Sequence, residues 1–152
     1  SEVDLNRGIV RRNLIAGVAP EHITINRTAG TIYAADADAG QVVELDVSTG
    51  AERRVFEIGG EIHGLDLSKD GRRLFVAGKE SDTLAAVELA TGRITRAALA
   101  PAPYHLTTIP GTGTLFVSSR DEPKVWIVDN ATLMSRSEFE IEGEGHQMVA
   151  LP

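Results

Sequence analysis

The four histidines of the chain are its most suggestive chemical feature, because they recur at an almost constant interval. His22, His63, His105 and His146 are separated by 41, 42 and 41 residues. Neutral imidazole nitrogens are common ligands of transition metals, so several imidazoles brought to one place could bind such an ion. The chain has no cysteine. A site built from imidazole and carboxylate without thiolate favours zinc first and copper second.

Acidic residues stand close to three of these histidines. Glu21, Glu61 and Glu144 precede them by one or two residues, so each could bind the same ion or accept a hydrogen bond from a ring N–H. Met148 is a weaker candidate ligand. Two other roles fit the same histidines: lining of a hydrated channel, inherited through duplication of one repeat, and acid–base catalysis. Because crowded imidazoles coexist more easily when neutral, the cluster favours the form that binds metal.

Other residue types recur in phase with the histidines, which indicates a structural repeat of roughly 41 residues. A glycine follows each of the first three histidines by eight residues, then comes an aromatic residue, and an acid follows the aromatic by thirteen. These positions are Gly30, Gly71 and Gly113; Tyr33, Phe75 and Phe116; and Asp46, Glu88 and Asp129. The one-residue slip between Gly71 and Phe75 predicts a turn lengthened by Arg72 and Arg73.

Each repeat contains four short apolar runs separated by turn residues, which is the pattern of a four-stranded antiparallel blade. Residues that favour strands dominate the runs, and no helical periodicity competes. The expected strands cover 22–25, 31–36, 41–47 and 53–58; 63–67, 72–78, 84–90 and 93–99; and 105–109, 114–119, 124–129 and 135–141. The sequence therefore predicts an all-β fold, a β-propeller of which this chain supplies about three and a half blades.

The repeat divides a single propeller segment, 1–152, into five parts. These parts are 1–19, 20–60, 61–101, 102–144 and 145–152. The first part supplies only the last two strands of a blade, over 3–5 and 10–15, and the last part supplies only a first strand. Because unpaired strand edges invite association, we expect further blades or a second chain to close the ring.

The segments VVELDVSTGAERRVFEIGG (42–60) and HGLDLSKDGRRLFVAG (63–78) resemble the YVTN-type β-propeller repeat. The repeat is similar to the haem d1 domain of nitrite reductases and to propeller-type periplasmic metal chaperones. The resemblance implies that the first strand of each blade lines the central channel, with the loop entering it on the face that binds ligands. It also implies a bacterial periplasmic or secreted protein. This sequence carries histidine where the common repeat often carries glycine.

Several classes of function are disfavoured. The net charge of -7 and the lack of a basic cluster argue against nucleic acid as a partner. The apolar runs are too short for a membrane span. No nucleophile elbow, phosphate-binding loop or dinucleotide fingerprint occurs, so the motifs give no support for enzyme activity.

The leading hypothesis is therefore a non-enzymatic extracytoplasmic binding protein whose axial histidine cluster holds a transition metal, zinc first, or another small axial ligand. One alternative is a protein–protein interaction scaffold that binds no metal. The other is a lyase or oxidoreductase that depends on a metal or on haem d1. These alternatives stay open at the level of sequence, because propellers host binding, scaffolding and catalysis alike.

Overall fold

The computed structural model describes residues 1–150, and in that range the chain forms fourteen strands and no helix. The strands are β1 (Glu2–Asp4), β2 (Ile9–Arg12), β3 (Pro20–Asn26), β4 (Thr31–Asp36), β5 (Gln41–Asp46), β6 (Glu52–Glu57), β7 (Ile62–Leu67), β8 (Arg73–Gly78), β9 (Thr83–Glu88), β10 (Arg93–Ala98), β11 (Pro103–Ile109), β12 (Thr114–Ser119), β13 (Lys124–Asp129) and β14 (Ser135–Glu140). The described residues include no helix long and apolar enough to cross a membrane.

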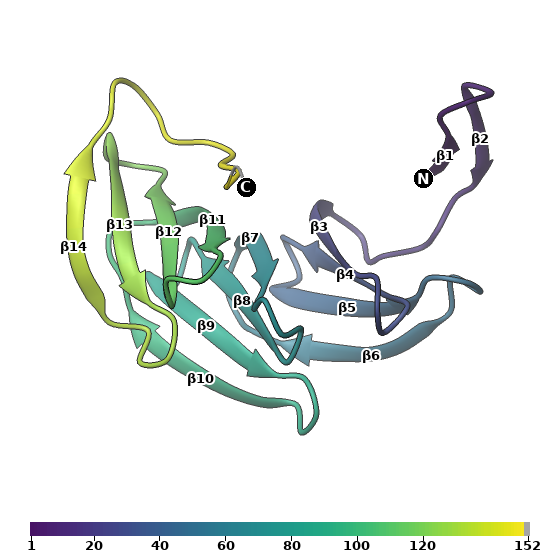
Figure 1. Ribbon diagram of the computed structural model, residues 1–152, viewed down its shortest axis with the longest axis horizontal. Helices are drawn as coiled ribbons and strands as arrows, with labels where there is room; N and C mark the ends of the chain where they lie inside the picture. Colours follow the sequence, from purple (N-terminus) through teal and green to yellow (C-terminus); the bar gives the residue numbers. More distant parts are fainter. Residues whose placement is uncertain (151–152) are drawn as a thin grey trace.

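The strands form three complete blades and a half blade. Within the described chain, β3–β6, β7–β10 and β11–β14 each make a four-stranded sheet, and β1 and β2 make a separate two-stranded one. All neighbours within a sheet pair antiparallel. The sheets spread like a fan, with β3, β7 and β11 on the inner side and β6, β10 and β14 on the outer rim (Figure 1). This is the expected all-β propeller architecture of about three and a half blades.

Turn chemistry explains why the strands begin and end close to the expected residues. Asp46 Oδ1 accepts hydrogen bonds from the backbone N–H groups of Ser48 and Thr49 at 2.8 and 2.9 Å, and Asp129 does the same in the third blade. Gly50 follows in the left-handed region, with φ of 75°, which glycine adopts without steric cost. These acids and glycines are therefore turn formers.

The slip in the repeat lies in β7 and not in the turn that follows it, which corrects the sequence interpretation. In every blade, the aromatic residue pairs with a residue nine positions before it, so the intervening turn has the same length throughout. The pairs are Thr24 with Tyr33, Asp66 with Phe75, and Thr107 with Phe116. His22 and His105 lie two residues before their paired position, but His63 lies three before. All three inner strands have a register irregularity at this point, so His63 occupies the position that Tyr104 has in β11.

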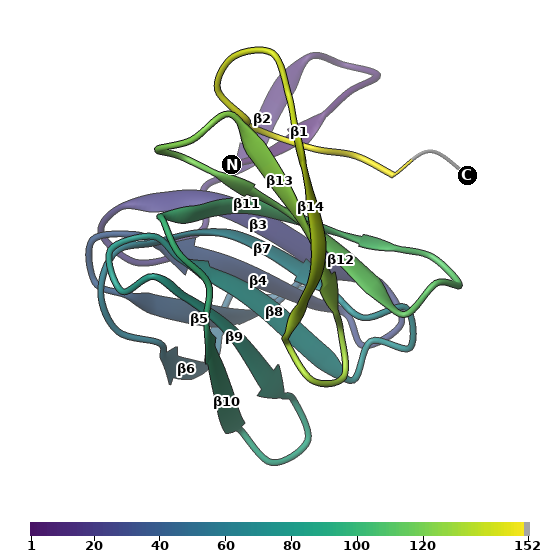
Figure 2. The same cartoon turned by 90° about the vertical axis from the view of Figure 1, so that its left-hand side faces the viewer.

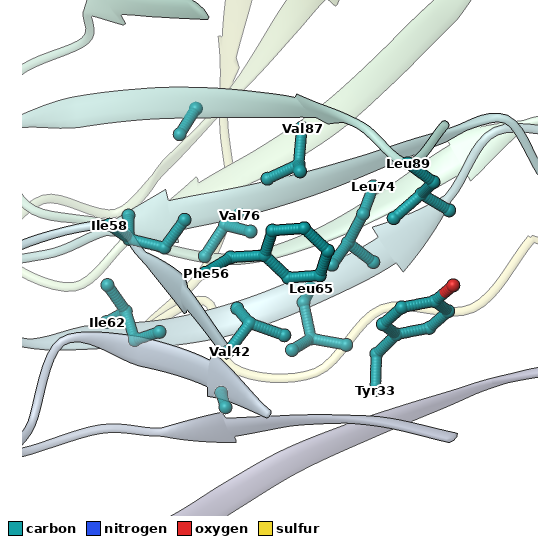
Figure 3. Packing of buried hydrophobic residues seen from close by; sticks show 12 residues of the cluster. Tyr33, Val42, Phe56, Ile58, Ile62, Leu65, Leu74, Val76, Val87 and Leu89 are labelled. Carbon is teal, nitrogen blue, oxygen red and sulfur yellow. The ribbon is translucent and has the colours of Figure 1, made fainter. Parts of the chain in front are cut away.

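The core lies between the blades. Tyr33, Val42 and Phe56 of the first blade pack against Leu65 and other residues of the second (Figure 3). A second cluster joins the second blade to the third and includes Trp126. Phe56 and Trp126 are thus core residues between blades. Because neighbouring blades bury side chains against each other, they hold each other in place and fix the inner strands relative to one another.

The two ends of the chain differ from the complete blades. The β1–β2 hairpin stands apart from the fan (Figures 1 and 2). The first strand expected over 146–151 does not form in its described part, 146–150, because the described chain provides no strand for it to pair with; residues 151–152 lie outside the described residues. The segment after β14 instead runs back toward β11, and the Ser118 hydroxyl donates to the His146 carbonyl at 3.4 Å.

Candidate functional site

The inner strands bring the four histidines together. His22 is the third residue of β3, His63 the second of β7 and His105 the third of β11. His146 belongs to the segment that returns from β14. Residues spaced about one repeat apart therefore meet at one end of the inner strands, as the repeat predicted.

His105 lies at the centre of this axial cluster. Its ring centroid is 4.6 Å from that of His146, 5.3 Å from that of His22 and 6.4 Å from that of His63. Rings that share a zinc ion through Zn–N bonds of 2.0–2.1 Å have centroids about 5 Å apart. The spacing of the cluster is thus of the order that a shared ion requires.

Tyr104 belongs to the same cluster and was missed by the sequence analysis. Its ring centroid is 4.5 Å from His63, 4.5 Å from His105 and 5.3 Å from His146. The Arg120 guanidinium lies over the Tyr104 ring, with its Cζ atom 5.4 Å from the ring centroid. The signal was its position next to His105, since the irregular start of an inner strand lets two consecutive side chains reach the same region.

His105 is buried and has a nitrogen without a partner. Its relative exposure is 8%, and Nδ1 makes no hydrogen bond. Burial lowers the pKa of His105 to about 4, with further lowering by the neighbouring imidazoles of His22, His146 and His63. His105 is therefore neutral at pH 7 and keeps a lone pair for a ligand.

His63 is held by an acid from its own blade. Its Nε2 lies 2.7 Å from Glu61 Oε1, and the Lys79 ammonium donates to the same oxygen at 2.7 Å. Hydrogen bonds from Lys79 and His63 lower the pKa of Glu61. Glu61 is therefore ionised at neutral pH and orients His63, which is the role expected for one of the three nearby glutamates.

His22 is tied to the next blade. The backbone N–H of Leu65 donates to His22 Nδ1 at 3.3 Å. Burial lowers the pKa of His22, while the Asp66 carboxylate opposes that effect and His63 adds to it. His22 is thus a link between β3 and β7 as well as a member of the cluster.

The other candidate ligands from the sequence are placed less favourably for binding an ion together with the histidines. Glu144 pairs with Arg120, and Glu21 is exposed. Met148 is partly buried in the returning segment. Of the three glutamates, only Glu61 has a hydrogen bond to a histidine among the contacts of residues 1–150.

The donor atoms of the cluster do not converge on one point as they stand. Among residues 1–150, no group of three or more His, Asp or Glu side chains is arranged to hold a metal ion. Coordination would require the rings to turn about their side-chain torsions. The donor set itself, imidazoles beside an ionised carboxylate, suits zinc or copper.

Comparison with known proteins identifies the fold alone. No family model matches the chain, and no curated protein matches its sequence. Hydrazine synthase of Kuenenia stuttgartiensis is similar in structure, with a TM-score of 0.77 and 16% identity over 91% of this chain and 41% of that one. U3-55K has a TM-score of 0.74 and 15% identity over 88% of this chain and 42% of its own.

A third similar structure is apo AztD of Citrobacter koseri, with a TM-score of 0.63 and 12% identity over 77% of this chain and 33% of that one. The WD40 repeats of RRP9 also match. The chain therefore has a β-propeller fold. It spans less than half the length of each of these four structures.

Proposed function

We propose that this chain is part of a non-enzymatic binding propeller whose axial histidine cluster holds a transition metal, zinc first. The observation that carries the proposal is the unpartnered Nδ1 of His105, buried at the centre of three other imidazoles. A buried polar atom without a partner costs about 1–3 kcal/mol. Such an atom needs an explanation, and a bound ion is one.

The surroundings of His105 support a cation rather than an anion. His105 is neutral at pH 7, so it adds no positive charge of its own. The Glu61 carboxylate is held against His63, and it supplies a negative charge beside the rings. Zinc comes before copper because its tetrahedral sites are commonly built from imidazole and carboxylate.

We also propose the family and compartment that the sequence resemblance implies. The repeats over 42–60 and 63–78 resemble those of YVTN-type propellers, which occur in bacterial surface-layer and periplasmic proteins. Periplasmic or secreted localisation follows from that resemblance. Fractionation of the native bacterium, with antibodies to the chain, tests it: recovery from the cytoplasm would contradict it.

The metal proposal is tested by elemental analysis and thermal unfolding of the chain, purified without nickel affinity. We expect stoichiometric zinc after dialysis against a zinc buffer and a melting temperature that rises with added zinc, because binding only to the folded state stabilises it. Replacing His63 and His105 together by alanine should abolish the rise.

The matched control truncates two other side chains of inner strands, Thr24→Ala with Thr107→Ala. This variant removes no imidazole or carboxylate, so it should keep the zinc-dependent rise. Equal zinc binding by the parent and the double histidine variant would contradict the proposal, and the protein-interaction scaffold would then lead. An absorbance band of bound haem would instead favour the haem d1-dependent enzyme.

A further inference from the structure

The four histidines of the cluster do not offer the same nitrogen to a ligand. A carboxylate oxygen only accepts hydrogen bonds, so the 2.7 Å contact with Glu61 Oε1 places the proton of neutral His63 on Nε2. Lys79 donates to the same oxygen and holds the carboxylate in place. The lone pair of His63 is therefore on Nδ1.

His22 has the opposite arrangement. Its Nδ1 accepts the backbone N–H of Leu65 at 3.3 Å, so in the neutral ring the proton is on Nε2 and the lone pair is already used. Metal binding through Nδ1 would leave the Leu65 N–H without its acceptor. Binding through Nε2 would require removal of the one N–H proton that the neutral ring has. His22 is thus a poor ligand although its ring is 5.3 Å from that of His105.

The other two histidines remain available. The buried Nδ1 of His105 has no partner, and the His146 ring centroid is 4.6 Å away. Tyr104 gives an independent grouping, because its ring is within 4.5, 4.5 and 5.3 Å of His63, His105 and His146. These are the same three histidines in which the hydrogen-bond pattern leaves a nitrogen lone pair available for a ligand.

We propose that the axial cluster is a three-histidine site in which His63, His105 and His146 bind the ion, His63 and His105 through Nδ1, while His22 stays outside as a link between blades. Glu61, held by Lys79, is the positioning residue that turns Nδ1 of His63 toward the ion. The inference rests on the proposed metal function. Three protein ligands leave the fourth position of a tetrahedral zinc ion open to water or an exchangeable partner.

Imidazole ¹⁵N spectra of the parent chain, recorded without metal and with one equivalent of zinc chloride, test the assignment directly. Before zinc is added, His22 and His63 should both be Nε2–H tautomers. After addition, the Nδ1 resonances of His63 and His105 should move, and both resonances of His22 should stay. Movement of His22, or coordination of His63 through Nε2, would overturn the proposal.

Calorimetric titration with zinc chloride adds a comparison of variants. His63→Ala, His105→Ala and His146→Ala should each weaken binding by about a hundredfold or more, since even loss of a residue that orients a ligand costs about 10–100-fold. His22→Gln retains an oxygen that can accept from the Leu65 N–H, and its affinity should equal that of the parent. Equal losses in all four variants would contradict the three-histidine site.

Glu61→Gln has a matched control in Glu144→Gln. Both acids lie two residues before a histidine, but Glu144 pairs with Arg120 instead. We expect Glu61→Gln to weaken zinc binding by about 10–100-fold and to release the tautomer of His63, with no change for Glu144→Gln. Equal effects of the two substitutions would mean that Glu61 acts only through its negative charge, and they would overturn its positioning role. No zinc binding by the parent would overturn the metal function together with this site.

Discussion

The inner strands of the first two blades, β3 and β7, occupy equivalent places but have different surroundings. Ile23 lies opposite Ala34, the residue after Tyr33, and Leu65 lies opposite Val76, the residue after Phe75. Ile23 is nevertheless 57% exposed and Leu65 only 1%. The repeat therefore determines which side chains point toward the preceding blade, and the presence of that blade determines whether they are buried.

The polar ends of the two strands differ as well. His22 lies two residues before the position that pairs with the aromatic, whereas His63 lies three before its own. From this earlier position His63 contacts Glu61, while His22 accepts a backbone N–H. Equivalent residues in the sequence pattern thus have different chemical roles.

The largest effect in this comparison is expected for Leu65→Ala. The substitution leaves a cavity between the first and second blades and should lower the free energy of unfolding by about 2–5 kcal/mol. Urea unfolding followed by tryptophan fluorescence measures it, since Trp126 reports on the next interface. A loss below about 1 kcal/mol would mean that the interface relaxes to fill the space.

Zinc should stabilise the chain next most strongly, by about 2.7 kcal/mol at a free concentration one hundred times the dissociation constant. Protons compete with the ion for imidazole, whose ordinary pKa is about 6.5. The rise in melting temperature should therefore be larger at pH 7.5 than at pH 5.5. Scanning calorimetry at both pH values checks this, and an equal rise would exclude histidine ligands.

An effect of the same order is expected from His105 without metal, about 1.4 kcal/mol for each unit by which its pKa is lowered. The unfolded chain binds a proton below pH 6.5, but folded His105 does so only near pH 4. Stability should therefore be lost as the pH falls from 6.5 to 4. His105→Gln should make the free energy of unfolding less dependent on pH between 6.5 and 4, as measured by urea unfolding.

A second acid window separates this effect from that of the turn carboxylates. Backbone and side-chain hydrogen bonds lower the pKa of Asp129 to about 2, so its contribution is lost only below the ordinary aspartate pKa. Asp129→Asn should remove the pH dependence that this group adds below pH 4, and it should leave the slope of stability against pH between 6.5 and 4 unaltered, with the same loss throughout that interval. A change of slope near pH 5 would show that the two windows are not independent.

The smallest effect is expected for Ile23→Ala, below about 1 kcal/mol in the isolated chain, because most of this side chain is already exposed. The same urea titration used for Leu65→Ala provides the measurement. A cost equal to that of Leu65→Ala would mean that another chain covers the face of β3 in solution, and the molar mass from light scattering should then exceed that of one chain.

Much of the fold follows from local sequence signals. The strands of the three complete blades begin and end within a few residues of the expected ranges, because glycines and turn-forming acids such as Asp46 and Gly50 mark the reversals. The strand expected over 146–151 does not form over its described residues, 146–150, because a strand needs a neighbour to pair with and its sequence alone cannot supply one.

The candidate site was less predictable than the fold. Periodicity brought His22, His63 and His105 to the inner strands, but tautomers depend on contacts made across blades, such as that between His22 and the Leu65 N–H. The positions equivalent to Tyr104 hold Glu21 and His63 in the other blades, so no recurring aromatic residue gave a periodic signal. Contacts between segments 40 or more residues apart decide these details, and no local pattern encodes them.

Gly64, in the irregular part of β7, also limits how far the repeat can be idealised. It stands directly before Leu65, where β3 has His22 before Ile23 and β11 has His105 before Leu106. A Cβ atom at Gly64 would lie 2.6 Å from the His105 Cα, so the second blade cannot carry a histidine there without moving β11. A consensus design that gave every blade a histidine at this position would therefore force the inner strands apart. The difference between Gly64 and the histidines of the other two blades is thus a steric requirement of this chain.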